Sequence, residues 1–177
     1  MIRIRWALSL LVVACILAHG DEPPTKHNVR ELAKELGVAT IQGDYAKVID
    51  HTYDSVVELM GGRNMAIEIL AKQMEQMKAE GLIIKEYRVG EPEEFLTEGE
   101  NTFVIVPSHM EMVMPGRKIL SKSFLLGISS DKGKTWKFIE GSGLVKNGKE
   151  VRAKWLPRLP ANLKFPELEA PKVIEDK

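Results

Sequence analysis

The stretch Ile119–Ile139 constrains the fold more than any other part of the chain. Two runs typical of strands, Ile119–Ser129 and Thr135–Ile139, flank the short polar segment Asp131–Lys134. The runs are rich in branched and aromatic residues, which pack well on a pleated surface. Asp and Gly in the segment between them favour a tight turn. We therefore expect the central strands of a curved antiparallel sheet here, with the preceding helices packed on one face.

The segments before this stretch predict helices first and strands afterwards. Apolar residues at helical spacing predict helices at residues 27–42, 44–60 and 64–80. The second helix is either continuous or broken near Tyr53–Asp54. Alternating patterns predict strands at residues 82–89 and 102–114, and residues 94–97 are either a short edge strand or part of the connection. This order predicts an α+β fold, in which three N-terminal helices pack on a strongly curved antiparallel sheet of about four strands.

Prolines modify this plan in two places. Pro107 lies inside a predicted strand and cannot donate to a ladder, so it predicts a bulge or an edge position. A short helix is expected at residues 149–155, and a Pro-rich C-terminal tail without regular structure should follow it. The expected divisions are a signal peptide at 1–20, a leader at 21–26, the α+β domain at 27–143, and the short helix with the tail at 144–177.

Residues 1–20 have the three parts of a secretory signal peptide. Two arginines precede an apolar run at residues 6–17, and Ala18 and Gly20 provide small residues before a cleavage site at Asp21. The run is shorter than the roughly 20 apolar residues of a membrane-spanning helix. We therefore expect a secreted or periplasmic protein.

The alternative location depends on Cys15, the one cysteine of the chain. Val12–Cys15 resembles a bacterial lipobox, which predicts a lipoprotein anchored through a lipidated Cys15. The apolar residues that continue after Cys15 are atypical of a mature lipoprotein. If cleavage follows Gly20 instead, the mature chain has no cysteine and therefore no disulfide or thiol chemistry.

The charge balance argues against polyanionic partners. The chain has 25 basic and 25 acidic side chains, and loss of Arg3 and Arg5 with the signal peptide gives 23 − 25 = −2. A weakly acidic protein lacks the basic surface that binds nucleic acid or an anionic bilayer. No nucleic acid is expected as a partner, and no membrane unless Cys15 is lipidated.

The order of elements resembles the cystatin-like cone of the nuclear transport factor 2-like superfamily, which includes SnoaL-type cyclases and ketosteroid isomerase. The helical segment at residues 43–82 and the strand segments at 102–114 and 122–141 carry the likeness, which covers about residues 29–143. Secreted bacterial members have similar sequences. The resemblance implies a cone-like domain and often a homodimer, but this superfamily hosts isomerases, dehydratases, binding modules and protein partners alike, so it implies no single activity.

A second, local resemblance concerns the turn. Ser129, Asp131, Gly133, Thr135 and Trp136 fit the Asp-box of sialidases, a turn motif that recurs in each blade of a propeller. One copy in a chain of this length predicts turn chemistry with the Trp packed nearby, rather than glycan binding.

A cone fold offers a pocket between the sheet and the helices. We expect this pocket to be lined by Met74, Met77, Val104, Val106, Leu125 and Trp136 and to suit a small, largely apolar molecule. The methionines of the third predicted helix are interpreted as flexible core fillers.

Two groups of residues could support proton transfer. His109 and Glu111 share one face of a predicted strand and could form a general base with its orienting carboxylate. Asp54 or His51 could act as a base beside Tyr53 as a hydrogen-bond donor. The simpler interpretation of the first group is that His109 and Glu111 point to solvent or a dimer surface, while Met110, Met112 and Met114 on the opposite face pack the core. The simpler interpretation of the second group is a solvated helix face with one aromatic side chain in the core. No metal or cofactor is expected, because the histidines have no ligand spacing and no phosphate loop is present.

The strand at 102–114 also predicts an interface. Phe103 and Ile105 should point to one face and Val104 and Val106 to the other. An apolar outer face indicates either a homodimer that pairs its sheets or a tail that folds back with Leu163, Phe165 and Leu168.

These patterns favour an extracytoplasmic small-ligand-binding or protein-interaction domain without catalytic chemistry. The alternative is a cofactor-free isomerase, dehydratase or cyclase that acts by proton transfer in the cone pocket.

Overall fold

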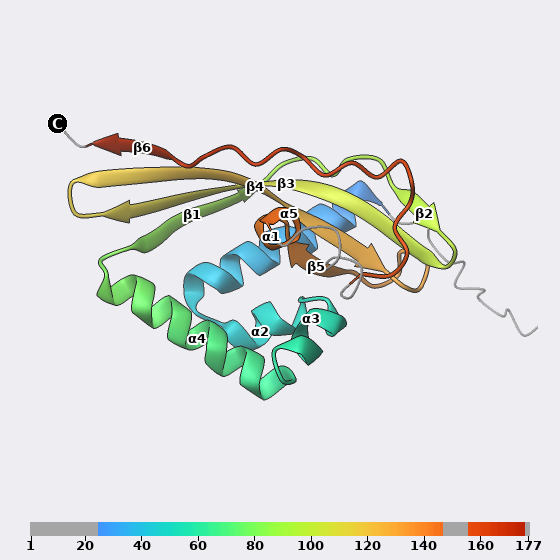
Figure 1. Cartoon of the computed structure of the whole chain (residues 1–177), viewed down its shortest axis with the longest axis horizontal. Coiled ribbons are helices and arrows are strands. Elements are labelled where there is room, and N and C mark those ends of the chain that lie inside the picture. The colour runs from blue at the N-terminus through green and yellow to red at the C-terminus, as the bar shows by residue number, and fades with distance from the viewer. Residues whose placement is uncertain (1–24, 147–155, 176–177) are drawn as a thin grey trace, which may run out of the picture.

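The computed structural model describes residues 25–146 and 156–175 (Figure 1). These residues form five helices and an open antiparallel sheet of six strands, which confirms the α+β class. The expected signal peptide, with Cys15, and the helix expected at 149–155 lie outside the described residues.

Four helices precede the sheet, where the sequence predicted three. They are α1 (Lys26–Gln42), α2 (Tyr45–Asp50), α3 (Asp54–Leu59) and α4 (Arg63–Ala79). Local signals set their ends. The Thr25 side chain accepts from the Asn28 backbone N–H and starts α1, and Gly43 ends it with φ +76°. The Asp44 side chain likewise accepts from the Lys47 backbone N–H and starts α2.

The break between α2 and α3 is a tertiary effect. The Tyr53 backbone N–H donates to the Phe138 carbonyl at 3.0 Å, and the Phe138 N–H donates to the His51 carbonyl at 2.8 Å. These bonds hold residues 51–53 beside the sheet in place of a continuing helix. Of the two possibilities for residues 44–60, the structure therefore has two short helices.

The sheet follows, with one short helix near its end. Its strands are β1 (Ile83–Val89), β2 (Leu96–Glu98), β3 (Asn101–Met114), β4 (Arg117–Ser129), β5 (Lys137–Glu140) and β6 (Lys172–Glu175), and α5 (Gly141–Lys146) follows β5. The prediction of about four strands was wrong because two further short strands form: β2, near the edge strand considered at residues 94–97, and β6 within the tail, where prolines predicted no regular structure. The strong curvature expected of a cone is not matched either.

The long hairpin of β3 and β4 organises the sheet. Their register runs through 13 pairs, from Thr102 opposite Ser129 to Met114 opposite Arg117, without a shift. On the side of β3 away from β4, β2 pairs with the first residues of the strand and β1 with its second half. On the side of β4 away from β3, β6 pairs with the first residues of the strand and β5 with its last residues.

Pro107 lies where the outer edge of β3 changes partner. Its carbonyl accepts from the Gly90 N–H just after β1 ends, and the proline, which has no N–H, makes no return bond at this margin of the pairing. Neither a bulge nor an edge strand is found at Pro107, because β3 lies inside the sheet and pairs there with β4 without a register shift. Pro107 lies instead where the pairing with β1 ends. The bulge occurs instead in β1, between Ile84 and Glu86.

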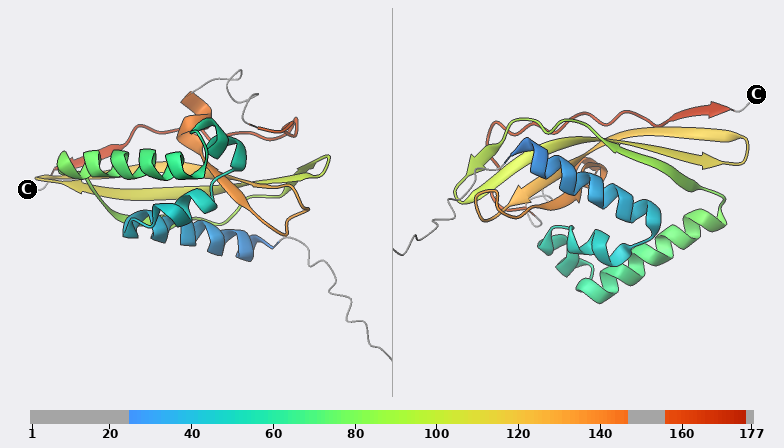
Figure 2. Two further views of the ribbon diagram at one scale, coloured as in Figure 1. Left: turned by 90° about the horizontal axis from the view of Figure 1, so that it is seen from below. Right: turned by 180° about the vertical axis from the view of Figure 1, so that it is seen from behind.

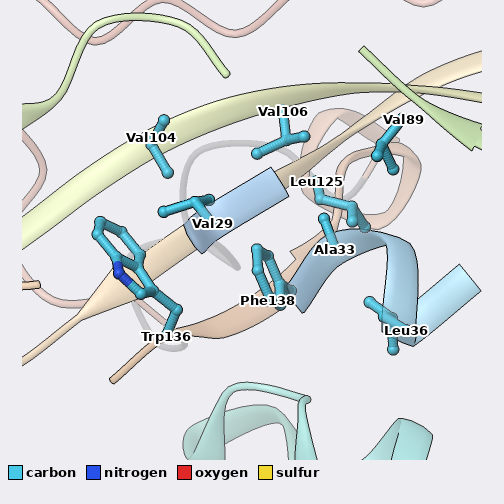
Figure 3. Packing of buried hydrophobic residues seen from close by; sticks show 9 residues of the cluster. All are labelled: Val29, Ala33, Leu36, Val89, Val104, Val106, Leu125, Trp136 and Phe138. Atoms are coloured by element: carbon cyan, nitrogen blue, oxygen red, sulfur yellow. The ribbon is translucent and has the colours of Figure 1, made fainter. Parts of the chain in front are cut away.

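One sheet face, here called the inner face, packs against α1 (Figure 3). The buried side chains of this cluster are Val29, Ala33, Leu36, Val89, Val104, Val106, Leu125, Trp136 and Phe138. Gly37 lets α1 approach β1 closely, because a Cβ at this position would lie 2.3 Å from the Tyr87 ring.

The outer face lies on the other side, towards α5 (Figure 2). Its buried cluster is Phe103, Ile105, Phe124, Leu126, Ile128, Ile139, Leu144 and Leu156. Leu159, Leu163, Phe165 and Leu168 of the tail pack over it. Phe103 and Ile105 are thus separated from Val104 and Val106 as predicted, and the tail covers the surface that motivated a homodimer. The homodimer therefore remains a prediction, but the apolar outer face no longer supports it.

The free end of the β3–β4 hairpin extends beyond α1 and α5 (Figure 1). We call this region the arm and define it as residues 108–123, flanked by β1 and β6. The helix α4 packs mainly against α2 and α3, and it lies beyond the β1 edge of the sheet and runs away from the arm (Figure 1).

Candidate functional site

The expected cone pocket is filled by the protein itself. Val104, Val106, Leu125 and Trp136 are buried against α1, which inserts Val29, Ala33 and Leu36 between them and solvent (Figure 3). These four side chains therefore pack the core.

Met74 and Met77 lie apart from that core. Both belong to α4, in which Ala66 alone is buried although the structure describes the whole helix. Met74 borders a small hollow between α1, α4 and β1, together with Ile41 and Ile84. The interpretation of the helical methionines as core fillers was therefore wrong, because α4 does not cover the sheet.

His51 lies on the α1 side of the sheet edge. Its Nε2 is 4.0 Å from Oε2 of Glu35, and Lys47 Nζ is 3.1 Å from the same oxygen. Burial lowers the pKa of His51, and the Glu35 carboxylate partly offsets this effect. The imidazole thus faces a carboxylate that a lysine already binds.

Tyr53 and Asp54 have different surroundings from His51. Tyr53 packs against the outer-face cluster, and burial raises the pKa of its hydroxyl. The Asp54 side chain is exposed, 3.9 Å from Lys137 Nζ. His51, Tyr53 and Asp54 thus form no shared acid–base site.

His109 and Glu111 share the outer face of the arm, as the alternation predicted. Lys118 Nζ binds Oε1 of Glu111 at 2.9 Å. His109 is exposed and lies opposite Arg88 on one side and Lys122 on the other. A lysine, and not His109, therefore engages the Glu111 carboxylate.

The five acid–base candidates thus fall in separate surroundings at two ends of the sheet. Within residues 25–146 and 156–175, no three His, Cys, Asp or Glu side chains are grouped to hold a metal ion. The geometry of these residues supports no proton-transfer constellation.

The Asp-box-like turn is the most completely bonded polar cluster. Asp131 Oδ1 accepts from the backbone N–H groups of Lys134 and Thr135 at 3.1 and 2.9 Å, and Oδ2 accepts from the Thr135 hydroxyl at 2.7 Å. The Ser129 hydroxyl donates to Asp131 at 2.7 Å and accepts from the Gly133 N–H at 2.7 Å. The carboxylate thus acts as a structural cap of the turn.

The same turn anchors Trp136. The indole Nε1 donates to the Gly133 carbonyl at 3.0 Å, and the ring stacks on Phe95 with centroids 5.6 Å apart. This arrangement agrees with the prediction of turn chemistry with Trp136 packed nearby.

Replacement of Asp131 by Asn should lower the free energy of unfolding by an amount that depends on pH. The backbone N–H of Thr135, with the other donors, lowers the pKa of Asp131 to about 2. A depressed carboxyl pKa stabilises the fold above the unfolded value of about 4 and loses that effect as pH falls towards 2. Because solvent still screens this half-buried carboxylate, we expect D131N to cost about 1 kcal/mol at pH 7.

Urea unfolding of both proteins between pH 7 and pH 3 measures this difference. The gap in unfolding free energy should narrow below about pH 4. A gap that is the same at pH 7 and pH 3 would contradict the role of the Asp131 charge.

The inner face of the arm is the functional candidate that the sequence reasoning passed over. Met110, Met112 and Met114 alternate along β3, and Met112 pairs with Ile84 on one side and Ile119 on the other. All five side chains are half-buried, and we call them the methionine face. The alternation was visible in the sequence but was interpreted as core packing.

The two faces of the arm differ in character. Charged side chains gather on the outer face, where Lys118 binds Glu111 and Lys122 binds Glu169 of the tail. On the inner face, Ser121 lies opposite Met110, and Arg117 lies only at the tip, 3.9 Å from Glu175. The inner face therefore presents apolar side chains with little charge.

No protein-family profile, curated protein or solved structure matches this chain. Among the helices of the described residues, none is long and apolar enough to cross a membrane.

Proposed function

We propose that the protein is an extracytoplasmic protein-interaction domain without catalytic chemistry of its own, and that it binds its partner through the methionine face. The location rests on the signal-peptide pattern at residues 1–20. The order of helices and strands supports a relationship to the nuclear transport factor 2-like superfamily, as part of the same proposal.

The observation that carries the proposal is the unequal covering of the sheet. Near α1 and α5, the apolar side chains of both faces are buried. On the arm, Met110, Met112 and Met114 are half-exposed, and among the described residues α1 and α4 border this face only at its Ile84 edge, where they line a small hollow. A contiguous apolar surface of this kind is characteristic of a partner-binding site.

The residue type strengthens this interpretation. Methionine is unbranched and polarisable, so a surface rich in it adapts to different apolar partners. The flanking Ile84 and Ile119 are branched and hold a fixed shape beside it. The methionine face thus combines an adaptable centre with rigid edges.

A small-molecule function has one supporting observation. A hollow of about 450 Å³ lies between the tail and the segment before β2, with Leu96, Ile105 and Leu163 among its lining residues. Sites for small ligands have volumes of about 300–1,000 Å³. Charged and polar side chains also line it, namely Glu93, Glu94, Asn162 and Lys164, so a small ligand with both apolar and polar groups would bind there and not in the filled core. The proton-transfer enzyme has less support, because its candidate residues do not converge.

A face-specific comparison tests the protein-interaction proposal. Tagged protein is expressed with its own N-terminal residues in its source cell, cross-linked and recovered, and the bound proteins are quantified. M110S/M112S changes the inner face, and the matched control H109S/K122S changes the outer face of the same strands.

We expect a protein that wild type and H109S/K122S retain at equal levels and that M110S/M112S loses at least tenfold. If M110S/M112S folds normally and retains the same proteins as wild type, the methionine face is not the contact surface.

A further inference from the structure

The methionines of this protein avoid its core. The chain has eight, and the seven that follow Met1 all lie in the described residues. None of the seven is among the buried hydrophobic side chains, although methionine is usually one of the most buried residue types. The core contains Val, Ile, Leu, Phe, Ala and Trp instead. Six of the seven side chains are half-buried and Met65 is exposed, so solvent reaches part of each of them.

Three of these thioethers share one surface. Met110, Met112 and Met114 alternate on β3, so their side chains leave the same face of the sheet. Residues two apart on a strand are about 7 Å apart at their Cα atoms. Two neighbouring methionines can reach one point between them, because each side chain is long and has three rotatable bonds. Met112 can pair with either neighbour.

The surroundings leave sulfur as the principal donor on this face. The cross-strand neighbours of Met112 are Ile84 and Ile119, which offer no ligand atom. Two cationic side chains of the described residues border this face. Arg117 lies at the tip, 3.9 Å from Glu175, and Lys78 of α4 lines the hollow beside Ile84. A cation that prefers sulfur meets little competition or repulsion near Met112.

Thioether ligands select soft metal ions, and Cu(I) is the biological ion of that class. Cys15 is the one cysteine and lies in the expected signal peptide, so methionine is the sulfur ligand of the mature chain. We propose that Met110, Met112 and Met114 form a binding site for Cu(I), with Met112 as its central ligand. This site differs from the His, Cys and carboxylate clusters on which the expectation of no metal was based.

Competition for Cu(I) measures the site directly. The purified protein is titrated anaerobically against the chromogenic chelator bicinchoninate. We expect one equivalent of Cu(I) per chain, at least tenfold weaker binding in M112L, and no competition by M110L/M112L/M114L. The control M65L/M74L, which removes two thioethers of α4, should bind like wild type. Leucine has a similar volume and polarity, so these variants should fold.

Ag(I), a redox-inert ion of the same class, provides a second measurement. In protein labelled at the methionine methyl groups, Ag(I) should shift the NMR signals of Met110, Met112 and Met114 and leave that of Met65 unchanged. Equal shifts of all methionine signals, or Cu(I) binding by the triple variant as tight as by wild type, would overturn the proposal.

The metal proposal and the protein-interaction proposal can fail separately. The triple leucine variant keeps an apolar face and loses its thioethers, so it should keep a protein partner and lose Cu(I). The serine variant M110S/M112S changes both properties.

Discussion

Removal of residues 157–177 is expected to lower the free energy of unfolding by about 4 kcal/mol and to cause self-association. Leu159, Leu163, Phe165 and Leu168 pack on the outer face, and each is half-buried. Partial burial of such side chains contributes roughly 1 kcal/mol each, about half the value for full burial. Their loss would uncover a broad apolar sheet face, which promotes association.

Urea unfolding and sedimentation of the truncated and full-length proteins measure the two effects. A matched control ends at Pro171 and removes only β6 and the last two residues. All four β6 side chains are exposed, so this control should lose less than about 1 kcal/mol and keep its oligomeric state. A truncated protein that is as stable as the full chain and does not associate would show that the tail does not cover the sheet.

Features that depend on neighbouring residues could be predicted from the sequence. Gly43 and Asp44 end one helix and start the next through bonds within three or four residues. Asp131 forms its turn with residues 129–135 in the same way. The β3–β4 hairpin follows from alternation on both sides of one turn.

Features that depend on residues far away in the sequence could not be predicted. The strand β6 has four residues directly after Pro171 and forms because β4 offers its edge more than 50 positions earlier. The break at residues 51–53 depends on bonds to Phe138. The sequence around β6 and around residues 51–53 does not show that β4 and Phe138 are their partners. The predicted numbers of strands and helices were therefore wrong.

The same distinction applies to the candidate site: local alternation predicted which side chains share a face, but not which face is buried. Alternation placed His109 with Glu111 on one face and the methionines on the other, and both assignments hold. Burial of the methionine face would require α4 to pack on it, and the periodicity of the sequence does not predict where α4 packs. Lys118 engages Glu111 through the cross-strand register, which is also a tertiary property.

Replacement of Phe124 by Ala should cost about 3–5 kcal/mol, the largest single-residue effect we expect. The ring is 1% exposed and stacks on Phe165 of the tail, with centroids 5.7 Å apart and planes at 19°. On its other side, a Cβ at Gly141 would lie 2.5 Å from the ring, so α5 leaves little freedom for rearrangement. The cavity left by F124A would therefore collapse only in part.

A double-mutant cycle isolates the contact with the tail. F124A, F165A and the double variant are compared by urea unfolding, and the coupling energy should be about 0.5–1.5 kcal/mol. F138A with F165A is the control, because Phe138 belongs to the inner-face cluster and should show coupling near zero. If the F124A–F165A coupling is also near zero, the two rings do not stack in solution. The stability assigned to the tail would then have to come from Leu159, Leu163 and Leu168 alone.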